Sequence, residues 1–520
     1  MPSAKKKRVA VRSKSPYADL AKELREIAVL SSVGSVIGWD QETMMPDRGA
    51  ALRAEQREAI SGLVHVRRTS RKLGDLISAS ESWAKRSGDA KVLANLREVR
   101  RDYDRATKLP ASLVAEITRC ASLGMEAWKD ARKNSDFKKF LPWLKKTMDL
   151  AREKARCYGI PKPTRGAPKP EVYDALLDEY EPDMTAARTD AIFGPLRERL
   201  VPMIESVAGS RSKPSEAPAR VRLPIDKQKE FVRRVCGAIG FQFESGRMDE
   251  SAHPFCEGIG PGDTRMTNRY RADGWTDALG TAMHESGHAM YEQGLPKDEC
   301  FGQPLAEAIS LGIHESQSRM WENLVGRSRA FWKWGRGEAR QVFGDSVGRA
   351  SADDLYKAVN LIRPNFIRVE SDELTYNLHI MLRFDLERAM INGSMNPRDL
   401  PEVWNRRLKN DFGLTVPDDR RGCLQDVHWS AGLVGYFPTY TFGNLYAAQF
   451  WEAMARDLPK RDSLIERGEF GPILAWLRKN IHAHGRRYSA EDLCKRVTGK
   501  PLTHDALLRH LESKVRNVYG

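Results

Sequence analysis

The sequence HESGH at residues 284–288 places two histidines four residues apart, with a glutamate directly after the first. In an α-helix, residues four apart lie about 40° apart around the axis, so both imidazoles can bind one metal ion. Glu285 lies about 100° round from His284 and is suited to take a proton from water held by that ion. The spacing therefore predicts His284 and His288 as metal ligands and Glu285 as general base, then acid, of a hydrolytic site.

The flanking residues favour the helix that this motif needs. Thr276 is a candidate N-cap, and Gly294 and Pro296 indicate where the helix ends. The alternative interpretation is a structural helix whose histidines only bond nearby carboxylates. The helical context and a usable third ligand downstream favour the metal site.

A catalytic zinc ion needs a third protein ligand, and the helix-like stretch 303–324 offers Glu307, His314 and Glu315. The two glutamates are eight residues apart, about 80° around a helix, so they do not easily serve the same ion. His314 and Glu315 are adjacent and point in different directions. Spacing alone leaves the choice open, although a carboxylate is favoured because two histidines and a glutamate form a common hydrolytic ligand set.

Composition limits the class of protein. The chain has 520 residues, of which 41% are hydrophobic and 30% charged, as in globular proteins. No stretch approaches 18 consecutive apolar residues, and no apolar segment follows the basic N-terminus, so neither a membrane span nor a secretory signal is predicted. The seven cysteines form no CxxC pair, which indicates a reducing compartment, and we predict a cytoplasmic location.

The formal net charge of +15 raises the question of nucleic-acid binding. Six of the basic residues stand in the first 14 positions, where there is no acidic residue. The sequence contains no basic groove interleaved with aromatics, no zinc-finger spacing and no RNP-like strand. We therefore predict no nucleic-acid partner and interpret the N-terminus as a solvated tail, in preference to a nuclear address.

Helical periodicity dominates the chain. A helix is predicted to begin at Ser15 as N-cap, and strand-like alternation is confined to the short stretches 220–224 and 265–270, which could pair into a small sheet. Loop-like composition at 159–171 and 208–224 indicates linkers or hinges. No internal repeat is evident. We therefore predict a basic disordered tail (1–15) followed by one mainly α domain (16–520).

Several further motifs, in their order along the chain, carry a resemblance to the carboxypeptidase Taq family of metallocarboxypeptidases. Ser371 stands where that family usually has alanine, and the basic N-terminus resembles an extension. The matching stretches, which span most of the chain, are WDQETMMP (39–46), YDALLDEYEP (173–182), HPF (253–255), DTRMT (263–267), HESGH (284–288), HESQ (314–317), IRVESDELTY (367–376), GCLQDVHW (422–429) and GYFPTYTFGN (435–444).

The resemblance implies a fold similar to that of neurolysin and angiotensin-converting enzyme, mainly helical, with a deep active-site groove and a small β-sheet. It implies removal of single residues from peptides with a free C-terminus, with broad specificity, often by a homodimer. It also implies Glu315 as third ligand, which leaves His314 without a role. Zinc is the expected ion, with cobalt or manganese possible because ligand sets of this kind accept them.

Recognition of a free C-terminal carboxylate requires a cation, and arginine provides a bidentate partner. Arg368 is the first candidate, the alternative being an ion pair with Glu370 or Asp372. Arg265 is a weaker candidate, the alternative being a structural pair with Asp263. In similar proteins HPF and DxRxT help to close one end of the groove.

An oxyanion forms during peptide hydrolysis and needs donors besides the metal. His428, Tyr436 and Tyr440 are candidates, each with packed core residue as the alternative. Asp372 or Glu373 could hold a ligand histidine by its other ring nitrogen.

Two other functions are alternatives to a metallocarboxypeptidase. A neurolysin-like oligoendopeptidase would cleave peptides whose C-terminus is amidated. A basic scaffold or RNA-binding protein would bind no metal, and the intact Glu285 argues against it.

Overall fold

The computed structural model describes residues 15–160 and 168–520. Most of the predicted tail and the centre of the predicted 159–171 linker lie outside these residues. The fold is mainly α with one small sheet, as predicted. None of the helices in the described part of the chain is long and apolar enough to cross a membrane.

The first part of the chain is a helical array with its own small apolar core, which contains Leu20, Ile77 and Leu96. Ser15 caps the first helix as predicted, because its hydroxyl accepts a hydrogen bond from the Ala18 amide at 3.2 Å. The helices are α1 (Pro16–Thr43), α2 (Ala50–Arg68), α3 (Arg71–Ser87) and α4 (Ala90–Lys108).

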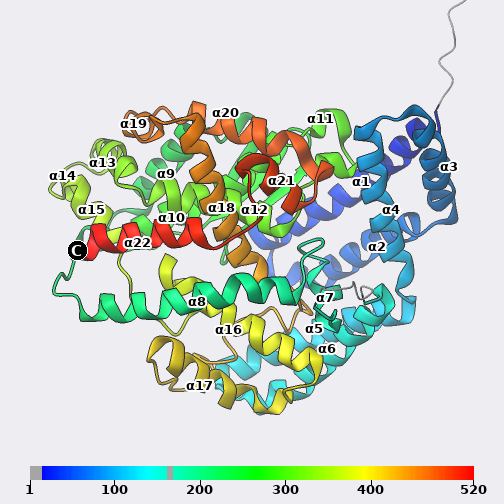
Figure 1. Ribbon diagram of the computed structural model, residues 1–520, viewed down its shortest axis with the longest axis horizontal. Helices are drawn as coiled ribbons and strands as arrows, with labels where there is room; N and C mark the ends of the chain where they lie inside the picture. Colours follow the sequence, from blue (N-terminus) through cyan, green and yellow to red (C-terminus); the bar gives the residue numbers. More distant parts are fainter. Residues whose placement is uncertain (1–14, 161–167) are drawn as a thin grey trace, which may run out of the picture.

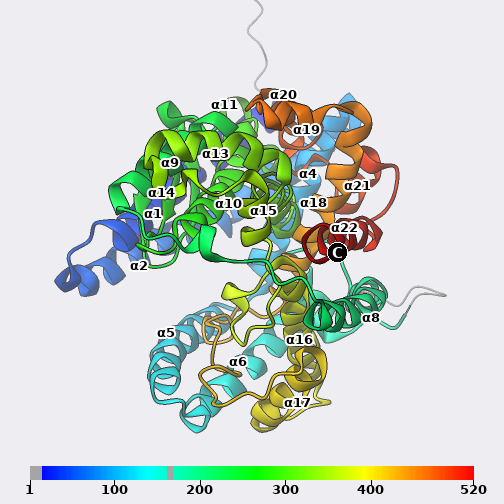
Figure 2. The same cartoon turned by 90° about the vertical axis from the view of Figure 1, so that its left-hand side faces the viewer.

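A lower lobe is visible in Figure 2, beneath a larger upper part. The lobe contains α5 (Ala111–Asn134), α6 (Phe137–Tyr158), α8 (Ala186–Gly209), α16 (Glu373–Asn392) and α17 (Leu400–Phe412), with α7 (Val172–Leu177) close to α6. The upper part contains α9 (Ile225–Ile239), α10 (Trp275–Gly294), α11 (Lys297–Cys300), α12 (Leu311–Arg319), α13 (Arg329–Phe343), α14 (Asp345–Gly348), α15 (Ala352–Val359), α18 (Pro438–Asp457), α19 (Arg461–Glu466), α20 (Gly471–Asn480), α21 (Ala490–Thr498) and α22 (Asp505–Tyr519).

Helix α12 packs against both α10 and α18 in the main apolar core, and Figure 1 shows the three helices in the upper half of the molecule. Small and apolar residues occupy most positions of α10 and α18, as expected of helices that are buried on nearly all sides. The predicted N-cap of α10 is wrong. Gly274 holds that position, and the Thr276 hydroxyl instead donates to the Ala219 carbonyl.

The sheet has the order β1-β3-β2, with β1 (Gly246–Glu250) parallel and β2 (Cys256–Gly260) antiparallel to β3 (Asp263–Asn268). The strand predicted at 265–270 overlaps β3. The strand predicted at 220–224 is wrong, because a 3₁₀ turn and an extended connection occupy that stretch. Pro218 lies just before this stretch and Pro224 is its last residue, and proline cannot donate to a sheet ladder.

Candidate metal centre

Helices α10 and α12 bring three donor atoms together. Glu315 Oε2 lies 3.6 Å from His284 Nε2 and 3.3 Å from His288 Nε2. All three donor atoms lie within 4.8 Å of one another. The structure therefore brings together the three residues predicted as ligands. Glu307 lies elsewhere, with its carboxylate 3.0 Å from Arg486.

Two glycines allow α12 to approach its neighbours closely. A Cβ on Gly287 of α10 would lie 2.5 Å from the carbonyl oxygen of Gln317, and one on Gly443 of α18 would lie 2.3 Å from Glu315 Cγ. Neither distance is compatible with a side chain unless the backbone or Glu315 moves. The glycine within HESGH therefore serves helix packing.

The environment of Glu315 keeps this carboxylate ionised. Arg319 Nε donates to its Oε1 at 2.6 Å, and the Ser318 hydroxyl donates to its Oε2 at 3.0 Å. Burial opposes ionisation, but the charge of Arg319 and the neighbouring His284 hold the pKa of Glu315 well below its usual range. Two imidazole nitrogens and one carboxylate oxygen are the donor set of many hydrolytic zinc sites, so these residues fit a divalent metal ion.

Glu322 holds His284, the first of the predicted metal ligands. Its Oε2 lies 2.9 Å from His284 Nδ1, and its other oxygen accepts a hydrogen bond from Arg327. A histidine that binds metal through Nε2 carries its proton on Nδ1, and a carboxylate there fixes the ring. Although burial raises it, the charge of Arg319 and the bond to His284 lower the pKa of Glu322 to about 2.

Sequence reasoning missed Glu322 and Arg319, although a signal for both was present. Glu315, Arg319 and Glu322 stand at positions i, i+4 and i+7, which share one face of a helix. The chain continues from α12 into a π-helical segment, η5 (Met320–Gly326). Such segments are frequent at functional sites.

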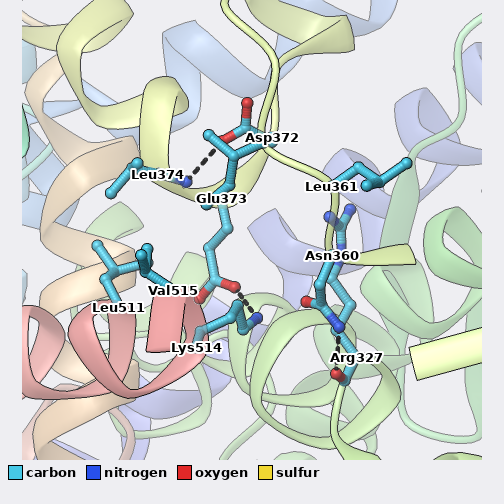
Figure 3. Close-up of a pocket in the computed structure, with 10 residues that line it drawn as sticks. Arg327, Asn360, Leu361, Asp372, Glu373, Leu374, Leu511, Lys514 and Val515 are labelled. Carbon is cyan, nitrogen blue, oxygen red and sulfur yellow. Dashed lines mark hydrogen bonds and ion pairs between the residues drawn. The ribbon is translucent and has the colours of Figure 1, made fainter. Parts of the chain in front are cut away.

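The prediction that Asp372 or Glu373 holds a ligand histidine is wrong. Asp372 caps α16 by accepting from the Leu374 and Thr375 amides, each at 3.0 Å. Glu373 pairs with Lys514 and His510 of α22. Figure 3 shows both acids around a small pocket, with Glu373 pointing toward Lys514. At the N-terminus of α16, Asp372 therefore bonds its own helix and Glu373 bonds α22.

Glu285 is buried beside the ligands, with 6% of its surface exposed. Burial raises its pKa to about 7, and the negative charges of Glu315 and Glu322 add to the rise while His284 opposes it. A carboxylate in such surroundings holds a proton more readily than one in water. That property suits a group that must both accept and release a proton near neutral pH.

Arg368 belongs to a buried polar cluster. It pairs with Asp426, its Nε lying 3.0 Å from Oδ1, and its Nη1 donates to the Tyr376 hydroxyl at 3.0 Å. The predicted partners Glu370 and Asp372 are not the ones it has. Its guanidinium also lies 5.0 Å from the ring centre of Tyr440.

The three oxyanion candidates adjoin Arg368. His428 Nε2 lies 3.1 Å from the Tyr440 hydroxyl, and the Tyr436 ring lies 5.3 Å from that of Tyr440. Burial, together with the negative charge of Glu315, raises the pKa of Tyr436. The structure thus brings Arg368 and all three candidates into one cluster.

Arg265 makes its contacts elsewhere. Two hydrogen bonds, of 2.8 and 2.7 Å, join it to Asp263, and its guanidinium lies 5.8 Å from the ring centre of Trp39. Trp39 also contacts Phe255 of the HPF motif, with ring centres 5.2 Å apart. Trp39 of the WDQE motif therefore lies between Phe255 of HPF and Arg265 of DxRxT.

The sequence matches the family described as carboxypeptidase Taq (M32) metallopeptidase over residues 19–515. It is 42% identical over 506 residues to thermostable carboxypeptidase 1 of Thermus thermophilus, which covers 97% of this chain and 99% of that protein. Carboxypeptidase 1 of Bacillus subtilis is 36% identical over 498 residues, with 95% and 97% covered. The chain belongs to the M32 carboxypeptidase family.

Solved structures of M32 carboxypeptidases share this fold. The M32 carboxypeptidase from Deinococcus radiodurans R1 superposes with a TM-score of 0.92 at 36% identity, covering 97% of this chain and 99% of that one. Metallocarboxypeptidase 1 of Trypanosoma cruzi gives a TM-score of 0.90 at 34% identity, with 97% and 100% covered. The predicted family, enzyme class and fold are confirmed, and membership implies a divalent metal ion.

In this M32 chain a cavity of about 750 Å³ extends beside the N-terminal half of α10. Its wall includes Thr281 and Met283 of α10, Val369 and Glu370 of the segment before α16, and Glu322. Val369 is 73% exposed. The cavity thus reaches the residue that holds His284, and it lies between α10 of the upper part and the segment that leads into the lower lobe.

Proposed function

We propose that this M32 metallopeptidase removes the C-terminal residue of peptides at a single metal ion held by His284, His288 and Glu315. The convergence of these three donors beside the buried Glu285 is the observation that carries the proposal. Zinc is the proposed ion, because the donor set suits it, with cobalt and manganese as alternatives.

Bound metal would supply Lewis acidity, which makes water a better nucleophile and polarises the substrate carbonyl. Glu285 accepts the proton of the attacking water and passes it to the departing amine, a sequence that its raised pKa favours.

Arg368 is the proposed partner of the substrate's free carboxylate. Its charge is fixed, and its position beside His428 and Tyr440 joins carboxylate recognition to the residues proposed to stabilise the oxyanion. Tyr436 is the third candidate donor. Arg265 is a weaker substrate candidate, because Asp263 holds both its Nε and its Nη2, whereas Asp426 accepts from Nε of Arg368.

A second copy of the chain is the proposed partner of the α1–α2 hairpin, which projects from the molecule in Figure 2. Val29, Val33 and Val36 are exposed on one stripe of α1, and Leu52, Leu63 and Val66 on one stripe of α2. Exposed apolar stripes of this kind favour association between protein surfaces. They support the homodimer that the family resemblance implied.

The seven cysteines are all free, which supports the proposed reducing, cytoplasmic location.

Two further points stay predictions. One is broad tolerance for the released residue, and the other is the organisation into a tail (1–15) and one domain (16–520) with hinges at 159–171 and 208–224.

The proposal is tested with one peptide prepared in two forms, one with a free C-terminus and one amidated, together with elemental analysis of the purified protein. We expect stepwise release of C-terminal residues from the free form alone and one equivalent of metal. Internal cleavage of the amidated form would instead indicate an oligoendopeptidase.

A further inference from the structure

His314, the first residue of the second HES triplet, lies directly against the second ligand histidine. Its Nδ1 is 2.5 Å from Nδ1 of His288, and the two ring centres are 4.5 Å apart with their planes inclined by 32°. On its other side, Nε2 of His314 lies 2.9 Å from Glu292 Oε1. The imidazole therefore bridges a metal ligand and a buried carboxylate.

The direction of these hydrogen bonds follows from the ligand role of His288. A neutral imidazole that binds metal through Nε2 carries its proton on Nδ1. That N–H donates to Nδ1 of His314, which must then be an acceptor and carry its own proton on Nε2. The Nε2–H donates in turn to Glu292. One tautomer of each histidine satisfies both bonds.

The far end of this chain is fixed to the protein. Glu292 pairs with Lys297 through its second oxygen. Although burial raises it, the bond to His314 and the charge of Lys297 lower the pKa of Glu292 to about 2. Strand β2 lies against the pair, because a Cβ on Gly258 would come within 2.2 Å of Glu292 Oε2 and 2.8 Å of Lys297 Nζ. Glu292 therefore has little freedom to move.

The two ligand histidines are held in different ways. Glu322 accepts directly from His284 at 2.9 Å, whereas Nδ1 of His288 faces His314, which stands between it and Glu292. A carboxylate that fixes a ligand imidazole is common in metal sites. Here a second imidazole transmits that constraint.

We propose that His314 is a positioning residue, which orients His288 for metal binding and is itself oriented by Glu292 and Lys297. The inference rests on the ligand set proposed above. It predicts that loss of His314 weakens metal binding, whereas a purely structural role predicts loss of stability in the metal-free protein with unchanged metal affinity.

The test compares His314→Phe, His314→Asn and a matched control, His484→Phe, in the full-length protein. His484 is a matched histidine because its ring meets the Tyr488 ring edge-on with ring centres 5.3 Å apart, while the His314 ring lies 5.4 Å from that of Tyr291. The readouts are the zinc dissociation constant, from competition with a chelating dye, and the visible spectrum of the cobalt-loaded protein. Circular dichroism of each metal-free variant reports folding.

We expect His314→Phe to weaken zinc binding about 10- to 100-fold, the usual effect of removing such a partner, and to shift the cobalt spectrum. His314→Asn should recover part of the affinity, because the asparagine oxygen can accept from His288 near the place of Nδ1. The control should bind as the wild type does.

An unchanged dissociation constant and cobalt spectrum in His314→Phe would overturn the inference. Should that variant fail to fold, Glu292→Gln decides: about 10-fold weaker binding supports the relay, and unchanged affinity rejects it. If the His288→Ala variant binds zinc as well as the wild type does, the ligand set itself is refuted, so the two failures are distinguishable.

Discussion

Gly443 of α18 lies directly against Glu315 of α12, so closely that a Cβ on the glycine would lie 2.3 Å from Cγ of the ligand. The position of the third proposed metal ligand is therefore set by the backbone of α18, a helix that supplies none of the proposed ligands. Arg319 and Ser318 then hold the carboxylate from within its own helix.

Gly443→Ala should displace Glu315 and weaken metal binding. We expect overpacking to cost about 1–3 kcal/mol of stability, measured by urea denaturation of the metal-free protein, together with weaker zinc affinity in dye competition. Gly337→Ala in α13 is the control, because no atom lies within 4 Å of the added Cβ, and it should leave affinity unchanged. Equal zinc affinity in the Gly443 variant would show that α12 and α18 can separate at no cost to the site.

Glu285→Gln should lower kcat by about 10²–10⁴-fold while the metal content stays at the wild-type level. The amide is close in size to the carboxylate but cannot take up the proton of the attacking water. Peptide hydrolysis and elemental analysis of the same preparation check this. Near-normal turnover would remove Glu285 from the mechanism.

Arg368→Ala should lower kcat/KM about 10- to 100-fold on peptides with a free C-terminus, because a charge-assisted hydrogen bond contributes about 1.5–3 kcal/mol. Asp426 keeps a partner in this variant, since Arg383 also bonds to it, at 2.6 Å. Arg265→Ala provides the comparison and should have the smaller effect. A larger loss in the Arg265 variant would reverse the order of the two candidates.

Glu387 should make the protein less stable as pH rises from about 4.5 to 7. It accepts hydrogen bonds from Tyr173, Trp429 and the Gly435 amide, yet burial raises its pKa to about 7. The folded state then binds a proton that the unfolded state, with a pKa near 4.3, has released. Stability is fully present below the unfolded pKa and falls by up to about 3 kcal/mol through the folded one.

Glu387→Gln checks this, because the amide does not titrate. Urea midpoints measured between pH 4.5 and 8 should fall less steeply in the variant, even if its stability is lower throughout. An identical slope in both proteins would assign the pH dependence to other groups.

The α1–α2 hairpin should control oligomeric state. We expect the double variant Val33→Lys and Leu63→Lys to be monomeric in sedimentation equilibrium, because each lysine places a charge within an apolar stripe. Leu93→Lys in α4, also exposed, is the control and should stay dimeric. A wild-type monomer would reject the proposed interface.

Spacing within one helix was readable from sequence. The separation of His284 and His288 requires only helical geometry, and Ser15 marks a helix start by type and position. Contacts between separate segments could not be predicted in this way. His314 of α12 bonds Glu292 of α10, and Arg368 pairs with Asp426, 58 positions later. No periodicity of the chain encodes such pairs.

The errors have local causes. Thr276 has the residue type of an N-cap, but Gly274 holds the N-cap position of α10. The Thr276 hydroxyl instead donates to the Ala219 carbonyl. Asp372 and Glu373 belong to the motif that carries Arg368, but Asp372 caps α16 and Glu373 pairs with Lys514 of α22 (Figure 3). Residue type alone does not give side-chain direction.

Helix α12 is approached closely by two glycines, Gly287 of α10 and Gly443 of α18. These two positions give a criterion for distinguishing active relatives from inactive ones. A chain with both histidines and both glutamates but a bulky residue at either glycine could not seat the third ligand without shifting a helix. Such a chain would carry every residue of the motif and still bind metal poorly. The two glycines are therefore as informative about metal binding in a relative as the proposed ligands are.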